Sequence, residues 1–395
     1  MISELKQEMR EVLENNILSY WMCRTIDRQN GGFYGRITGT EELKLEAEKG
    51  AILNARILWT FSAAYRLLKK EEYLIMATRA KRYLIDYFYD QEFGGIYWSL
   101  DYKGIPTDTK KQIYALGFAI YGLSEYHRAT DDAEALEYAI RLFEDIESHS
   151  FDPVKNGYCE ALTREWSEIG DMRLSEKDKN ERKTMNTHLH ILEPYTNLYR
   201  VWKDGRLEKQ LRNLVELFTD KILNAETGHL ELFFDNDWVS KYRIISYGHD
   251  IEASWLIHEA TLMLEDEALL AKVEPLVELI AAAADEGLTS QGSLIYETIP
   301  DQKKIDTDCH WWVQAENVVG HVNLYQYFDD EVALNKAFCC WNFIKKNLID
   351  HANGEWHWSV SATGTVNRED DKAGFWKCPY HNGRMCMEIL ERVIK

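Results

Sequence analysis

The sequence predicts an all-α protein folded as a single (α/α)6 barrel, a toroid in which six outer helices surround six inner ones. Three observations predict it: a glycine-centred motif that occurs six times, a charged amphipathic stretch before each copy, and a less charged helical stretch after it. Repetition at a nearly fixed spacing indicates a repeat architecture. The whole of 1–395 is therefore expected to form one domain.

Each copy of the motif places a glycine before alternating aromatic and polar residues, as in the run that begins at Asn30. This pattern predicts a tight turn leading into a short hairpin strand. The matched glycines recur every 62 to 71 residues: Gly32, Gly95, Gly157, Gly228, Gly292 and Gly354.

The stretches before the motifs carry Lys and Glu on one face, as expected for helices exposed to water. They are 3–21, 70–90, 131–148, 204–223, 265–286 and 329–348. The stretches after the motifs are less charged, which indicates burial. They are 50–68, 111–127, 187–202, 249–264, 311–328 and 380–393, with short hairpins in the connections.

An open superhelix would also fit the repeat, but the copies include no obvious polar capping units, which favours a closed ring. Pro194 predicts a break in the third inner helix.

Composition limits the class of partner. The formal net charge of −20 disfavours nucleic acid and anionic membranes. The seven cysteines show neither a disulfide framework nor metal-binding spacing. The first residues lack the apolar core of a signal peptide, and no apolar run reaches transmembrane length. A cytoplasmic protein is expected.

Polar and aromatic residues gather near the starts of the inner stretches, which lie at one mouth of such a barrel. His249 and Glu252 are three residues apart, so they share one face of a helix. His249, His381 and His190 are placed alike in three repeats, which favours function, whereas His258 and His321 fit structural roles better.

Other candidates at this mouth also have structural alternatives. Arg56 lies in an apolar run and needs an anionic partner, either an ion pair or a charge that develops during a reaction. Trp312 and Trp376 could belong to the core or could stack on a sugar.

A metal site is the alternative use of these side chains. His188 and His190, with His249 and Glu252, could supply ligands. Residues two apart on a helix point about 200° away from each other, so His188 and His190 do not easily share an ion. The sequence has no phosphate loop, Rossmann fingerprint or nucleophile elbow. No metal and no cofactor are therefore expected.

Several motifs together resemble the cellobiose 2-epimerases of the N-acylglucosamine 2-epimerase superfamily. The motifs occur in the same order as in that family, and the resemblance covers essentially the whole chain. They are Arg56, 186–190, 246–252, 311–316 and 375–384. The resemblance implies cofactor-independent inversion of C2 in the reducing-end glucose of β-1,4-linked disaccharides such as cellobiose and lactose. His249 and His381 match the acid/base pair. The positions that match the rest of the family's site are Arg56, Tyr114, Asn186, His190, Glu252, Trp312, Glu316 and Trp376.

The residues suit this chemistry, because epimerisation beside a carbonyl needs ring opening, removal of the C2 proton, a stabilised enediolate and reprotonation on the other face. Imidazoles titrate near operating pH and suit both proton transfers. His190 is expected to assist ring opening, Arg56 with Asn186 or Tyr114 to stabilise charge on O1, and Glu252 to orient His249 or raise its basicity. Reprotonation at C1 predicts a minor ketose product.

Three other functions remain open at this point. An N-acylglucosamine 2-epimerase or a mannose isomerase of the same superfamily would share the fold and histidines. A glycoside hydrolase would use a carboxylate pair such as Glu252 and Glu316. A non-catalytic sugar- or protein-binding module would need only the aromatic floor. The expected partner is a small disaccharide, and the expected assembly is a monomer or weak homodimer.

Overall fold

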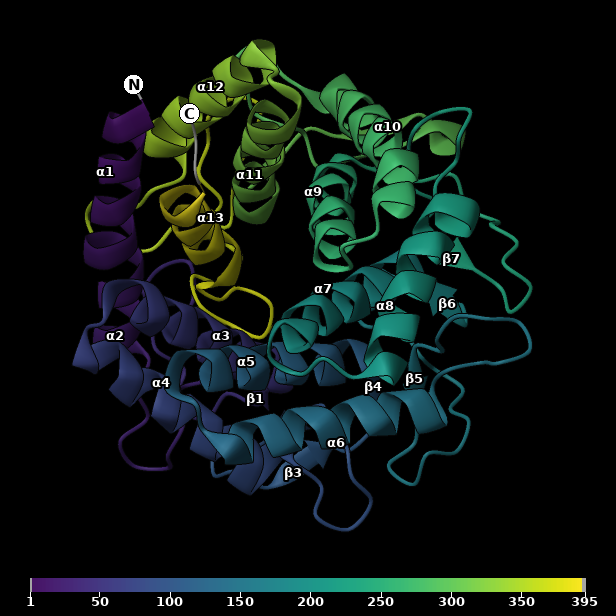
Figure 1. The fold of residues 1–395 in the computed structure, drawn as a ribbon. Helices are drawn as coiled ribbons and strands as arrows, with labels where there is room; N and C mark the ends of the chain where they lie inside the picture. Colours follow the sequence, from purple (N-terminus) through teal and green to yellow (C-terminus); the bar gives the residue numbers. More distant parts are fainter. Residues whose placement is uncertain (1, 393–395) are drawn as a thin grey trace.

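The computed structural model describes residues 2–392, and its helices form two concentric rings (Figure 1). The outer ring contains α1 (Ile2–Val12), which continues through a π-helical segment (Leu13–Leu18) into α2 (Ser19–Arg24), then α4 (Glu71–Tyr83), α6 (Ala133–His149), α8 (Gly205–Leu217), α10 (Glu267–Ala284) and α12 (Glu331–Asn347). The inner ring contains α3 (Ala51–Leu68), α5 (Ile113–Thr130), α7 (Met185–Val201), α9 (Tyr247–Met263), α11 (Trp311–Phe328) and α13 (Tyr380–Glu391). The predicted (α/α)6 barrel is confirmed.

Burial differs between the two rings as the charge pattern predicts. In α6 the buried side chains form one stripe at a spacing of three or four residues: Ala135, Ala139, Leu142, Phe143 and Ile146. In α3 every residue from Ala51 to Ala64 is buried. A helix buried on all sides has protein on every face, so polar residues on inner helices face either a partner or the barrel interior.

Aspartates begin the outer helices after very short connections from the inner ones. The carboxylates of Asp132, Asp204, Asp266 and Asp330 accept hydrogen bonds from backbone N–H groups in the first turns of α6, α8, α10 and α12. Such capping stabilises a helix start by about 1 kcal/mol. The short connections leave the longer loops at the opposite end of the barrel.

Those longer loops carry short antiparallel strands that join neighbouring repeats. Each strand that precedes an inner helix pairs with a strand in the next loop. The pairs are β1 (Lys49–Gly50) with β2 (Ser99–Leu100), β4 (Lys111–Gln112) with β5 (Ala161–Leu162), β6 (Lys183–Thr184) with β7 (Phe233–Phe234), β8 (Ile245–Ser246) with β9 (Glu297–Ile299), and β11 (Cys309–His310) with β12 (Ser359–Val360). β3 (Pro106–Asp108) extends the first of these sheets, and β10 (Lys304–Asp306) extends the fourth.

The six repeated glycines form the turns that the sequence predicts. All have positive φ, between 59° and 88°, a conformation that residues with a Cβ rarely adopt. Single antiparallel bridges flank the turns, for example Ile26 with Phe33 and Tyr89 with Ile96. The tight turns and short hairpins are therefore confirmed.

The first and last repeats meet, so the ring closes. α13 packs against both α3 and α1. The backbone N–H of Ile37 donates to the carbonyl of Ala373 at 2.7 Å, in the position that a strand pair occupies in the other repeats. In the outer ring, Glu8 of α1 accepts from Trp341 of α12 at 2.6 Å. The alternative of an open superhelix is excluded.

The predicted break at Pro194 is wrong, because α7 is continuous through it. Proline has no N–H to donate to the carbonyl of His190, four residues earlier. Gly117 of α5 lies directly against that carbonyl, and a Cβ on Gly117 would be 2.2 Å from its oxygen. Close packing against α5 therefore holds α7 in place where its own hydrogen bond is missing.

The inner stretch predicted for 380–393 is α13, and residue 393 lies outside the described residues. Within residues 2–392, no helix is long and apolar enough to cross a membrane.

Candidate active site

The residues predicted for the site lie at the loop-bearing end of the barrel, near the first turns of the inner helices. A cavity of about 470 Å³ opens there, and Asn186, Ser246, His249 and Tyr296 are among the residues that line it. The longest repeat spacing, between Gly157 and Gly228, belongs to a loop that contributes Met172, Arg173 and Lys177 to the same wall. The extra length of this repeat therefore shapes the mouth.

Each of the three candidate histidines is held through its Nδ1 atom. His381 Nδ1 lies 2.6 Å from Glu316 Oε1, and His190 Nδ1 lies 3.1 Å from Glu193 Oε2. A carboxylate only accepts hydrogen bonds, so these two imidazoles carry their proton on Nδ1 and have a free lone pair on Nε2.

His249 has a different partner, since its Nδ1 lies 2.8 Å from the Ser246 hydroxyl. A hydroxyl can donate or accept, so His249 can adopt either tautomer. Among the described residues, none of the three Nε2 atoms has a protein hydrogen-bond partner.

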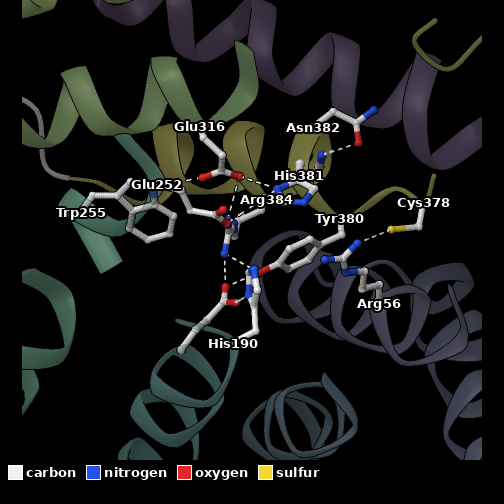
Figure 2. A network of polar contacts seen from close by, with 12 residues as sticks. Arg56, His190, Glu252, Trp255, Glu316, Cys378, Tyr380, His381, Asn382 and Arg384 are labelled. Atoms are coloured by element: carbon white, nitrogen blue, oxygen red, sulfur yellow. Dashed lines mark hydrogen bonds and ion pairs between the residues drawn. The ribbon is translucent and has the colours of Figure 1, made fainter. Parts of the chain in front are cut away.

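Arg384 of α13 joins three buried carboxylates into one network (Figure 2). Its Nη2 donates to Glu252 and to Glu316, each at 2.7 Å, and its Nη1 donates to Glu193. Tyr380 also donates to Glu193. The network connects α7, α9, α11 and α13 and contains the Nδ1 partners of His190 and His381, so it fixes the positions of these two histidines.

Arg56 is buried without a carboxylate partner among the described residues. Its side chain is 3% exposed, Nη2 donates to the Tyr114 hydroxyl at 2.8 Å, and Nη1 lies 3.9 Å from the sulfur of Cys378. Its guanidinium also lies over the rings of Phe118 and Tyr380, at 4.2 and 4.9 Å from their centroids. A buried cation with only neutral neighbours is well suited to stabilise an anion that forms beside it.

Aromatic rings connect these groups. Trp312 lies 4.8 Å from His249 and 5.6 Å from His381, measured between ring centroids. Tyr114 lies 4.9 Å from His190 and 6.0 Å from Trp376. The structure therefore brings His249 and His381 together around Trp312, and Arg56 and His190 together around Tyr114. Trp312 and Trp376 are only partly buried, so part of each ring is accessible to a ligand.

Burial keeps the three histidines neutral at neutral pH. Burial lowers the pKa of His249 to about 3, and the neighbouring His190 acts in the same direction. Burial, followed by the charges of Arg56 and Arg384, lowers the pKa of His381 well below its ordinary value. Burial also lowers the pKa of His190. Neutral imidazoles with free Nε2 atoms can act as bases.

The prediction that Glu252 orients His249 is wrong. Glu252 accepts from Arg384, and its Oε1 lies 3.9 Å from His381 Nδ1, whereas Ser246 holds His249. Glu252 and His249 do lie on one face of α9, but the residue that positions His249 is the one that precedes the helix.

Sequence reasoning missed Glu193, Tyr380, Arg384 and Ser246. Arg384 and Glu193 had a usable signal, because both are charged residues in inner helices, where burial requires a partner. Ser246 carried no signal beyond its place just before the helix.

Two histidines with predicted structural roles have protein partners. His258 Nδ1 accepts from the Asn323 amide at 3.1 Å, and His321 contacts the Asn317 carbonyl and Asp285. His188 lies between the Thr184 carbonyl and the Tyr158 backbone N–H, facing away from His190. His188 and His190 therefore do not form a ligand pair.

Glu252, Glu316 and His381 are close enough to surround a cation, with candidate ligand atoms within 4.8 Å of one another. The guanidinium of Arg384 already bonds to both carboxylates. Arg384 thus supplies the positive charge at this position.

Comparisons with known proteins agree on one family. The family model for N-acylglucosamine 2-epimerase (GlcNAc 2-epimerase) matches residues 32–383. The cellobiose 2-epimerase of Bacteroides fragilis is 71% identical over 386 residues, which cover 98% of each chain. The solved structure of cellobiose 2-epimerase from Bacillus thermoamylovorans B4167 has a TM-score of 0.94 at 43% identity, covering 99% of this chain and 100% of that one. A solved D-mannose isomerase, 21% identical with a TM-score of 0.86 and covering 98% and 97% of the two chains, shares the fold.

Proposed function

Because the chain belongs to the N-acylglucosamine 2-epimerase family, we propose that it inverts C2 of the reducing-end glucose in β-1,4-linked disaccharides without a cofactor. Cellobiose would become 4-O-β-glucosyl-mannose, and lactose would become epilactose. The high identity to a cellobiose 2-epimerase supports a disaccharide substrate. We also propose that 1–395 acts as one catalytic domain, as a monomer or weak homodimer in the cytoplasm.

The single observation that carries this proposal is the placement of Arg56. A buried guanidinium that lacks a carboxylate partner lies beside Tyr114, which in turn contacts His190. The arrangement suits a reaction in which negative charge forms on a substrate oxygen next to a group that moves protons. Removal of a proton beside a carbonyl is such a reaction, because it generates an enediolate.

Each step of the reaction has its own residues. His190 moves a proton between O1 and O5 to open the sugar ring, with Glu193 stabilising the imidazolium that forms. Arg56, with Tyr114 and Asn186, stabilises the charge on O1. Trp312 and Trp376 stack on the sugar faces.

His381 and His249 exchange the proton at C2. With the sugar bound, one of them is neutral and removes the proton from C2, while the other carries a proton taken up from solvent and returns it to the opposite face, so each turnover reverses their states. Glu316 stabilises the charged form of His381. The negative enediolate favours protonation of His249 and so opposes the effect of burial, which lowers the pKa of this imidazole.

Hydrolysis fits the carboxylates poorly. A glycoside hydrolase needs two carboxyl groups about 5 Å or more apart on either side of the scissile bond. Glu252 and Glu316 instead accept hydrogen bonds from the same nitrogen of Arg384. We therefore do not assign them as a hydrolytic pair.

The test is incubation of EDTA-treated protein with cellobiose in D2O, followed by NMR. We expect 4-O-β-glucosyl-mannose with deuterium at C2, and at least about a hundredfold lower rate for His249→Ala and for His381→Ala. His351→Ala, which changes an exposed histidine, serves as the matched control. Slow appearance of the ketose is expected on prolonged incubation, since the enediolate can also be protonated at C1.

Other products would contradict the proposal in distinct ways. Release of free glucose would indicate a hydrolase. Exchange of the C2 proton in mannose or N-acetylmannosamine, with cellobiose unchanged, would indicate a monosaccharide enzyme of the family. Sugar binding without turnover, unaffected by His249→Ala, would indicate a binding module.

A further inference from the structure

Three fully buried carboxyl groups surround Arg384, and their charges do not balance. Glu193, Glu252 and Glu316 are each at most 2% exposed. Arg384 is the cation that bonds to all three. If every carboxyl group were ionised, Arg384 could neutralise one charge and Arg56, whose guanidinium lies 4.9 Å from the ring of Tyr380, a second. The third negative charge would be buried without compensation, which costs several kcal/mol.

The hydrogen bonds distinguish the three groups. Glu316 accepts from Arg384 at 2.7 Å, from His381 at 2.6 Å and from the indole N–H of Trp255 at 3.1 Å. Glu193 accepts from Arg384, Tyr380 and His190. A carboxylate that accepts three hydrogen bonds is strongly stabilised in its ionised form. Glu193 and Glu316 are therefore the two ionised groups.

Glu252 is different, because only one of its oxygens has a partner. Oε1 accepts from Arg384 at 2.7 Å, whereas Oε2 is buried and has no hydrogen-bond partner. An ionised oxygen left unpaired in a buried place is the most costly arrangement, and a proton on that oxygen removes the charge.

We propose that Glu252 is a neutral carboxylic acid with its proton on Oε2, and that this O–H donates a hydrogen bond to a substrate oxygen during the reaction. The catalytic part of this inference rests on the proposed epimerase function. Glu252 lies one turn after His249 on α9, and its other oxygen is 3.9 Å from His381 Nδ1. The proposal requires that a sugar carbon held between the two histidines place one of its hydroxyl oxygens next to the unpartnered Oε2. A neutral acid can donate to a developing oxyanion, whereas a carboxylate would repel it.

Electrostatics around Glu252 act in the same direction. Burial, then the charge of Glu316, raises the pKa of Glu252 well above its ordinary value, and Arg384 opposes this. The titratable and charged groups on the helices around it are Arg56, Tyr114, Glu193, His190, His249, Glu316, Tyr380, His381 and Arg384. Burial also raises the pKa of Tyr114 and of Tyr380, so both phenols are neutral at neutral pH.

The direct test is infrared difference spectroscopy of the full-length protein near pH 7, comparing wild type with Glu252→Gln. We expect Glu252→Gln to lose one carbonyl band of a protonated carboxylic acid that Glu316→Gln and Glu193→Gln keep. The band of Glu160, whose pKa burial raises to about 8, is common to all the proteins and cancels in the difference. Absence of a difference band for Glu252→Gln would overturn the proposal. This readout does not depend on any activity.

Kinetics with cellobiose test the catalytic part. Glu252→Gln keeps a hydrogen-bond donor and should lower kcat/KM less than about tenfold, whereas Glu316→Gln should lower it more than about a hundredfold. Wild-type activity should fall at alkaline pH as Glu252 ionises, and Glu252→Gln should lack that decline. Equal losses in the two variants would overturn the role as donor. If the infrared band is present but cellobiose is not converted, the neutral acid stands and the epimerase proposal fails.

Discussion

At the scale of single residues, Arg56 shows how a charge without a partner marks a functional position. Its neighbours are phenolic and aromatic rings on α5 and α13 and a thiol just before α13, none of which is an anion at neutral pH. An arginine kept only for structure would be expected to bond to a carboxylate, as Arg66 on the same helix does with Glu125 and Glu391. The contrast between these two arginines leads to a matched experiment.

Arg56→Lys should lower kcat for cellobiose about a hundredfold with only a few-fold change in KM. Lysine keeps the positive charge but loses the planar fork that places donors at a fixed position. The loss should fall on kcat because the charge that Arg56 stabilises develops during the reaction. Arg66→Lys is the control and should keep wild-type kcat. A change confined to KM would show that Arg56 only binds the ground-state sugar.

The sequence predicted the members of the site better than their pairings. Residues at the starts of inner helices could be identified because the repeat locates those starts. The partner of His249 could not be identified in this way. Spacing places Glu252 on the same face of α9 as His249, but it cannot show that Glu252 bonds instead to Arg384, 132 residues further along the chain. Contacts between different inner helices depend on side-chain directions that no local pattern encodes.

At the scale of elements, the junction between α5 and α7 depends on Glu160. Its backbone carbonyl accepts from Ile113 at the start of α5, and its carboxyl oxygens accept from Thr184 at 2.7 Å and Thr187 at 2.8 Å at the start of α7. Burial raises the pKa of Glu160 to about 8. In the unfolded chain a glutamate has a pKa near 4.3.

Glu160→Gln should therefore become progressively more stable than wild type as the pH rises from about 4.5 to 8. Over this range the unfolded state loses the proton that the folded state keeps, so ionisation favours unfolding of the wild type only. The difference in the free energy of unfolding should reach roughly 3 to 5 kcal/mol at pH 8 and vanish near pH 4. Urea unfolding at several pH values measures it, with the exposed Glu165→Gln as control. A difference that does not vary with pH would contradict the assignment.

The repeat elements themselves were largely predictable. Glycine at positive φ in all six turns gives a signal that depends only on local geometry. Pro194 misled the prediction for the opposite reason. Its effect on α7 is decided by Gly117 on another helix, which allows the two backbones to approach.

At the scale of the whole molecule, the site exists because the ring closes. Arg56 comes from the first inner helix and His381 and Arg384 from the last, so the catalytic group is assembled only when α13 packs against α3. In the outer ring the corresponding contact joins α12 to α1. Trp341, 1% exposed, donates to Glu8, and Lys345 donates to the same carboxylate at 2.8 Å.

Glu8→Ala should lower the free energy of unfolding by about 1 to 3 kcal/mol, because it leaves the buried indole N–H of Trp341 without an acceptor. Glu8→Gln keeps an acceptor oxygen and should cost less. Glu137→Ala, which removes an exposed ion pair with Arg141 within α6, should change stability by no more than about 0.5 kcal/mol.

Denaturant unfolding followed by tryptophan fluorescence and far-UV circular dichroism distinguishes a closed ring from a stack of independent repeats. In a closed ring the two probes should move together to a lower midpoint in Glu8→Ala, since the weakened contact supports every repeat. Separate transitions, with the terminal repeats unfolding first, are what a linear array of repeats would give.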